Sequence, residues 1–126
     1  MLFALLNLAC TEIEYDDGHY TENNTFYVIY ESNPSPIPLN EYFSITVTPY
    51  ADNSKSEILN DVTVYVDAIM PDHNHGMNEE PETTLQADGS FLSEGLKWHM
   101  EGLWELQIYV TKDYTEMAAI DIECCS

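Results

Sequence analysis

The chain has 126 residues, enough for one domain with a hydrophobic core and too few for two. Hydrophobic residues make up 44% of it and aromatic residues 12%, a composition typical of a globular rather than a disordered protein. Its 23 acidic and 3 basic side chains give a formal net charge of -20, which all but excludes electrostatic binding to nucleic acid or to an anionic membrane. Cations are the natural partners of such a surface, although the same charge also serves solubility alone.

Residues 1–10 form an apolar run that ends at Cys10 and is too short to span a bilayer. The run is similar to the end of a bacterial lipoprotein signal peptide, in which Cys10 would carry the lipid. No basic segment precedes it and Asn7 stands where leucine is usual, so a first strand of the fold is the alternative. We expect an acidic tether at 11–24 and the folded domain at 25–126, anchored by lipid in the periplasm or on the outer cell surface.

The first expected strands follow the tether. Residues 25–30 are all β-branched or aromatic, and the proline-rich segment 33–38 stops the run. Residues 42–48 alternate between apolar and polar, which indicates a half-buried strand. Residues 62–68 alternate in the same way, and the count places Met70 on the inward face, where core packing is a more natural role than metal binding.

The second half of the chain predicts four more strand segments. Asp88 and Gly89 form a tight hairpin turn between 83–85 and a second edge strand at 91–92. Residues 96–110 are the longest strand-like region, in which Gly102 allows a turn or bulge, and 117–123 is the last strand. On this count Met100 points into the core and His99 points away, either into solvent or over the loop as a third imidazole.

About seven short strands with turn signals between them, and no helical pattern, predict an all-β fold. We expect a single immunoglobulin-like antiparallel β-sandwich, with a small barrel as the alternative.

Residues 70–77 hold two methionines and two histidines beside a proline and a glycine. A thioether is a soft ligand suited to Cu(I), and imidazole suits copper and zinc, so this mixture favours copper over magnesium or calcium. His73 and His75 would share a face in an extended segment, and Gly76 frees the backbone to fold Met77 back. The alternative is that the histidines are solvated and the methionines cap the core.

The same residues carry a resemblance to a known family. The matching features are Tyr27–Val28 before 34–36, the strand end and loop at 67–77, Pro81, Asp88–Gly89 before Phe91, and 95–104. Over about residues 25 to 123 the chain resembles the YtkA-like and FixH-like domain family, small immunoglobulin-like sandwiches outside the cytoplasmic membrane. The resemblance implies copper handling, including supply to copper-containing oxidases. The positions it retains are Met70, His73, His75, Met77 and Met100; His99 is not part of the family pattern.

We therefore expect a copper-binding protein, a Cu(I) carrier, scavenger or supplier of a copper enzyme. His73, His75 and Met77 would bind the ion, with His99 or Met100 completing three or four ligands and Met70 a lesser candidate. Nearby acidic side chains would steer cations or support the ligands: Asp72, Glu79, Glu80 and Glu101. The expected partners are the copper ion, a copper-accepting or copper-donating protein, and the membrane through a lipid anchor, with no nucleic acid.

Two other functions compete with copper handling. One is an immunoglobulin-like accessory or interaction module of a membrane complex, with the loop as a protein contact and no metal role. The other is Zn or Ca binding through carboxylates, which leaves the methionines unexplained. An enzyme is not expected, because no nucleophile-base arrangement or glycine-rich phosphate loop is suggested. Cys124 and Cys125 stay undecided between thiols and a disulfide, and outside the site.

Overall fold

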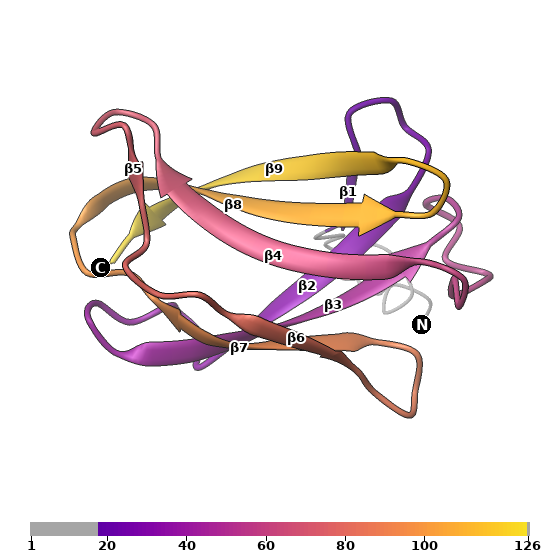
Figure 1. Ribbon diagram of the computed structural model, residues 1–126, viewed down its shortest axis with the longest axis horizontal. Coiled ribbons are helices and arrows are strands. Elements are labelled where there is room, and N and C mark those ends of the chain that lie inside the picture. Colours follow the sequence, from indigo (N-terminus) through magenta and orange to yellow (C-terminus); the bar gives the residue numbers. More distant parts are fainter. Residues whose placement is uncertain (1–17, 126) are drawn as a thin grey trace, which may run out of the picture.

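Two antiparallel sheets face each other in the computed structural model, which describes residues 18–125 (Figure 1). The first sheet has the order β1-β2-β3-β7-β6, with β1 at Gly18–Tyr20, β2 at Tyr27–Asn33, β3 at Tyr42–Tyr50, β7 at Phe91–Lys97 and β6 at Glu82–Leu85. The second has the order β5-β4-β8-β9, with β5 at His75–Gly76, β4 at Thr63–Met70, β8 at Gly102–Thr111 and β9 at Thr115–Cys124. The described residues contain no helical segment that could span a lipid bilayer.

The strand order is that of an immunoglobulin sandwich. Strands β2, β3, β7 and β6 correspond to A, B, E and D, and strands β5, β4, β8 and β9 correspond to C′, C, F and G. The predicted all-β antiparallel sandwich is confirmed, with nine strands among the described residues rather than about seven.

The core lies between the sheets and follows the predicted alternation. The inward side chains of β3, β4 and β8 are nearly all less than 8% exposed: Phe43, Ile45, Val47, Val64, Val66, Ala68, Met70, Trp104, Leu106, Ile108 and Val110. Met70 is 1% exposed, so its inward placement at the end of β4 is confirmed.

The region 96–110 is not one strand, and the prediction of a short second edge strand is wrong. Strand β7 runs from Phe91 to Lys97 between β3 and β6, so it is internal to its sheet. Residues 98–101 then cross to the other sheet, where β8 begins at Gly102 with a φ of 132°. Trp98 and Trp104 are both buried because each points inward from its own side of this crossover, not because one strand carries them.

The folded domain begins earlier than the predicted boundary at residue 25. Strand β1 pairs with β2, and the Tyr20 and Tyr27 rings pack edge to face with centroids 4.8 Å apart. The turn after β1 is held by Glu116, whose carboxylate accepts hydrogen bonds from Thr21 and Thr25 at 2.7 and 2.6 Å. Part of the polar segment expected as a tether therefore belongs to the sandwich; the rest, with Cys10, lies outside the described residues.

Candidate metal centre

The turn between β4 and β5 places the two histidines of the loop differently. Its backbone is closed by hydrogen bonds from His73 N to Met70 O at 3.1 Å and from Asn74 N to Pro71 O at 3.3 Å. Proline fixes φ for the start of such a turn, and Asn74 tolerates the left-handed φ of 56° that closes it. His73 consequently lies exposed at the tip, whereas His75 returns to pair with Met70 across β5 and β4.

His75 is half-buried and has one ring nitrogen engaged. Its Nδ1 lies 3.0 Å from the carbonyl oxygen of Gly76, which can only accept, so Nδ1 carries the proton in the neutral ring. The lone pair is then on Nε2, the arrangement found in metal-binding histidines whose other nitrogen donates to a carbonyl.

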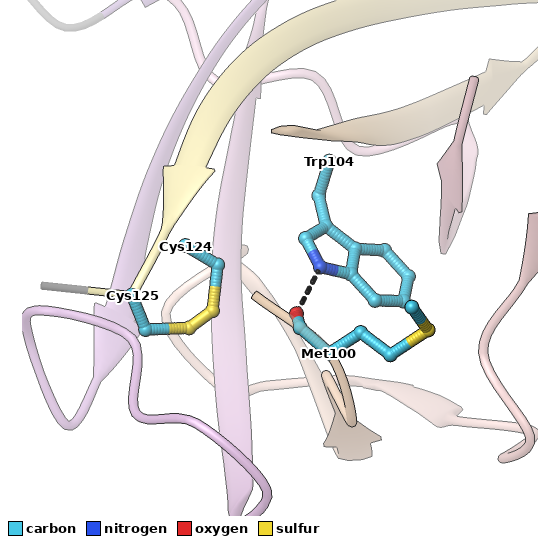
Figure 2. The surroundings of a disulfide bond; sticks show 4 residues. All are labelled: Met100, Trp104, Cys124 and Cys125. Carbon is cyan, nitrogen blue, oxygen red and sulfur yellow. Dashed lines mark hydrogen bonds between the residues drawn. A yellow bond between two sulfur atoms is a disulfide. The ribbon is translucent and has the colours of Figure 1, made fainter. Parts of the chain in front are cut away.

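The crossover 98–101 brings a third imidazole to the same place. Trp98 stacks on Trp104 with centroids 5.1 Å apart and planes 3° from parallel, and Trp104 Nε1 donates to Met100 O at 3.0 Å (Figure 2). These contacts hold His99 with its centroid 5.5 Å from that of His75 and 5.8 Å from that of Trp104. Of the two placements left open for His99, the structure shows the one near the loop.

His75 lies at a similar distance from each of the other two imidazoles. The His73 and His75 centroids are 5.8 Å apart, close to the 5.5 Å between His75 and His99. Imidazole nitrogens bind metal ions at roughly 2.0 Å, which places the centroids of two rings on one ion roughly 5 to 6 Å apart. Within residues 18–125, however, no three His, Cys, Asp or Glu side chains are arranged to hold a metal ion. The three imidazoles alone therefore do not form a metal site, and a site at this place would need thioether ligands as well.

His99 carries the one observation that points to a ligand. Its Nδ1 is buried and has no hydrogen-bond partner among the residues described. A buried nitrogen without a partner costs about 1–3 kcal/mol. Trp98 Nε1 is also buried without a partner, but it is only a donor and cannot bind a metal ion. A cation beside His99 would satisfy the imidazole nitrogen.

The methionines of the candidate site occupy two environments. Met70 lies in the core, and a Cβ added at Gly102 would stand 2.9 Å from its Cε. Met77 and Met100 are half-buried and pack against the core cluster. Figure 2 shows the Met100 side chain following the Trp104 indole, with its sulfur beside the six-membered ring. The expectation that Met100 points fully into the core needs correction, because the crossover breaks the alternation before it.

Four carboxylates lie on the surface at this end of the molecule, close in sequence to the candidate ligands. Asp72, Glu80 and Glu101 are exposed, and half-buried Glu79 accepts a hydrogen bond from Tyr42 Oη at 3.2 Å. Oxygen ligands suit hard cations, whereas exposed charges raise the local concentration of any cation.

Sequence reasoning set aside two sulfur atoms that lie at this end. Cys124 and Cys125 form a disulfide at the end of β9, across from Trp104 and Met100 (Figure 2). The signal was present in the alternation of Ala118, Ile120, Ile122 and Cys124, which continues along the inward face of β9.

Comparisons with known proteins bear on the fold. No family model matches the chain, and no curated protein matches it. The crystal structure of a DUF4426 family protein from Pseudomonas aeruginosa is similar, with a TM-score of 0.57 over 86% of this chain and 94% of that chain. The two sequences are 11% identical, so the likeness shows a common fold and nothing of function.

Proposed function

We propose that this protein binds Cu(I) outside the cytoplasmic membrane and acts as a carrier or scavenger of copper, or supplies a copper enzyme. The proposal follows the resemblance to the YtkA-like and FixH-like family, with Cys10 as the lipid-bearing residue. The observation that carries it is the pairing of His75 and His99: one imidazole has Nδ1 engaged by a carbonyl, and the other has a buried Nδ1 without a partner.

The proposed ligand set combines imidazole and thioether. His75 and His99 bind through nitrogen, and Met77 or Met100 binds through sulfur. His73 lies exposed at the tip and would have to turn toward the ion, since no three imidazoles of the described residues are arranged around one metal ion. Soft thioether sulfur favours Cu(I) over harder cations. Met70 supports the site from the core, since its side chain is already packed against the start of β8.

The arrangement suits holding and exchanging an ion rather than chemical turnover. His73 is exposed, so an acceptor protein can replace this ligand while the half-buried ones still hold the ion. The surrounding carboxylates attract cations to the loop. We therefore propose delivery by stepwise ligand exchange, with no catalysed reaction.

The proposal is tested by competition titration with Cu(I) against a chromophoric chelator, with Zn(II) in parallel. The full chain carries Cys10→Ser, and its disulfide is kept intact. We expect one Cu(I) per chain, with affinity lowered well beyond tenfold in the His73→Ala, His75→Ala double variant. His19→Ala is the matched control, because His19 lies on β1 beside Tyr30 and its loss should change nothing. Equal affinity in the double variant would refute the site, and absence of binding would favour an accessory module.

A further inference from the structure

The two cysteines at the end of β9 lie at the same end of the sandwich as the candidate metal centre. Cys124 pairs with Gly102, the first residue of β8, directly after the crossover that carries His99 and Met100. Cys124 is 5% exposed, and half-buried Cys125 packs against the core cluster. The sulfur atoms of these two cysteines therefore lie at the same end of the molecule as the candidate histidine and methionine ligands.

The side chains of Cys124 and Cys125 meet, which is unusual for consecutive residues at the end of a strand. Successive side chains of a strand point to opposite faces, which would separate the two sulfur atoms. Strand β9 ends at Cys124, and the structure brings the two sulfur atoms together in a disulfide. Reduction would leave two thiols on neighbouring residues, close enough along the chain to bind one ion together.

The cysteine pair is distinct from the methionine part of the centre. In Figure 2 the cysteines face the Nε1 side of the Trp104 indole, whereas the Met100 sulfur lies at the six-membered ring. In this view the buried indole lies between the cysteine sulfur atoms and the Met100 sulfur. Thiolates here would hold an ion of their own rather than complete the first.

We propose that Cys124 and Cys125 form a second, redox-controlled Cu(I) site that is closed as the disulfide and open as the dithiol. A dithiol reductant opens it: its two thiols transfer two electrons and two protons to the disulfide, leaving two cysteine thiols and the oxidised cyclic disulfide of the reductant. Cu(I) then binds both sulfur atoms as their two protons pass to the buffer, since thiolate is the ligand and selects Cu(I). The inference shares with the proposed function only the identity of the metal.

The test counts Cu(I) ions in oxidised and reduced protein. The full chain with Cys10→Ser is reduced with a phosphine, desalted without oxygen and titrated with Cu(I) beside the oxidised form. We expect the reduced protein to bind one more equivalent than the oxidised protein, and Cys124→Ser, Cys125→Ser to remove that equivalent. Equal stoichiometry in the reduced protein and the serine variant would overturn the inference.

Two further measurements separate this inference from the first proposal. The His73→Ala, His75→Ala variant should keep the extra equivalent after reduction, even if the histidine site is lost or never existed. In the Cys10→Ser chain, which needs no substitution at the pair, bound Cu(I) should protect both thiols from alkylation, as read by mass spectrometry. Alkylation of both thiols at the metal-free rate would refute the cysteine site whatever the histidines do.

Discussion

His73 and His75 lie two residues apart in one turn but differ in burial and in hydrogen bonding. The sequence predicted that they share a face, because they are two apart. Their rings do lie side by side, with centroids 5.8 Å apart, but the turn leaves His73 exposed and fixes His75 through its Nδ1 contact with Gly76 O and its pairing with Met70. Nothing in the sequence indicated this difference in burial, because it depends on the left-handed φ of Asn74 that closes the turn.

The inequality predicts a ranking of single substitutions. His75→Ala should weaken Cu(I) binding by roughly tenfold or more, and His73→Ala should weaken it less, because an exposed side chain must be ordered before it binds. Competition titrations of the two variants, side by side, measure the ratio. A larger loss from His73→Ala would show that the tip, not the half-buried ring, holds the ion.

Glu116 is a second residue whose role depends on contacts distant in sequence. It is 1% exposed, and hydrogen bonds from Thr25, and also from Thr21 and Asn23, lower its pKa below the ordinary 4.5 despite its burial. A carboxyl group with a lowered pKa in the folded state stabilises the fold above its unfolded pKa. That stabilisation is lost as the pH falls below about 4.5 and through the lower folded pKa.

We predict that Glu116→Gln lowers stability at neutral pH and reduces the loss of stability on acidification. Urea unfolding of the wild type and the variant at pH values above and below 4.5 measures the effect, and the difference between them should shrink in acid. Asp121→Asn is the matched control, since Asp121 is an acidic residue that lies exposed on the same strand, β9. A difference that stays constant with pH would contradict the role of Glu116.

Among the elements, β8 depends on the glycine at its first position. Gly102 has a φ of 132°, and a Cβ there would stand 2.9 Å from Met70 Cε. Only glycine adopts this φ without strain, and the close approach lets Met70 fill the end of the core. The start of β8 is therefore packed directly against Met70 at the end of β4.

Gly102→Ala should lower the free energy of unfolding by about 1–3 kcal/mol, from backbone strain together with the contact to Met70. Urea denaturation measures it, and the same substitution made in a Met70→Ala background isolates the contact. We expect a smaller cost in that background. An equal loss of unfolding free energy in both backgrounds would mean that the Met70 side chain moves aside without cost, and that backbone strain alone disfavours alanine at position 102.

How well an element could be predicted depended on whether its signal was local. The alternation in β3 and β4 and the Asp88–Gly89 turn were sufficient to predict their structure. The region 96–110 was predicted wrongly as one strand. Its buried apolar residues all fall on even-numbered positions, although the chain crosses from one sheet to the other between β7 and β8. His99 beside His75, and Cys124 beside Gly102, follow from pairing between distant strands, which local patterns do not specify.

At the scale of the whole molecule, the net charge of -20 opposes folding through self-repulsion. The described part of the chain holds one ion pair, between Lys112 and Asp61 at 3.0 Å, and both side chains are exposed. Added salt therefore weakens little favourable charge–charge attraction in this part of the fold. Screening should therefore stabilise the fold.

We predict that the melting temperature rises when ionic strength increases from about 10 mM to about 150 mM, which shortens the Debye length from about 30 Å to about 8 Å. Thermal unfolding followed by circular dichroism in NaCl checks this, with choline chloride as a control for specific sodium binding. A melting temperature that is unchanged or falls would show that repulsion is not a significant cost in this fold.

The most direct test of the copper site is to observe its sulfur and nitrogen ligands individually. Cu(I) is diamagnetic, so methionine methyl and histidine ring signals can be followed by NMR in the oxidised Cys10→Ser chain as the ion is added. We predict shifts of the Met77 or Met100 methyl and of the His75 and His99 rings, with Met117 on β9 and His19 on β1 unchanged as internal controls. Uniform shifts across all these signals, or none, would contradict a Cu(I) site at the β4–β5 turn and the crossover.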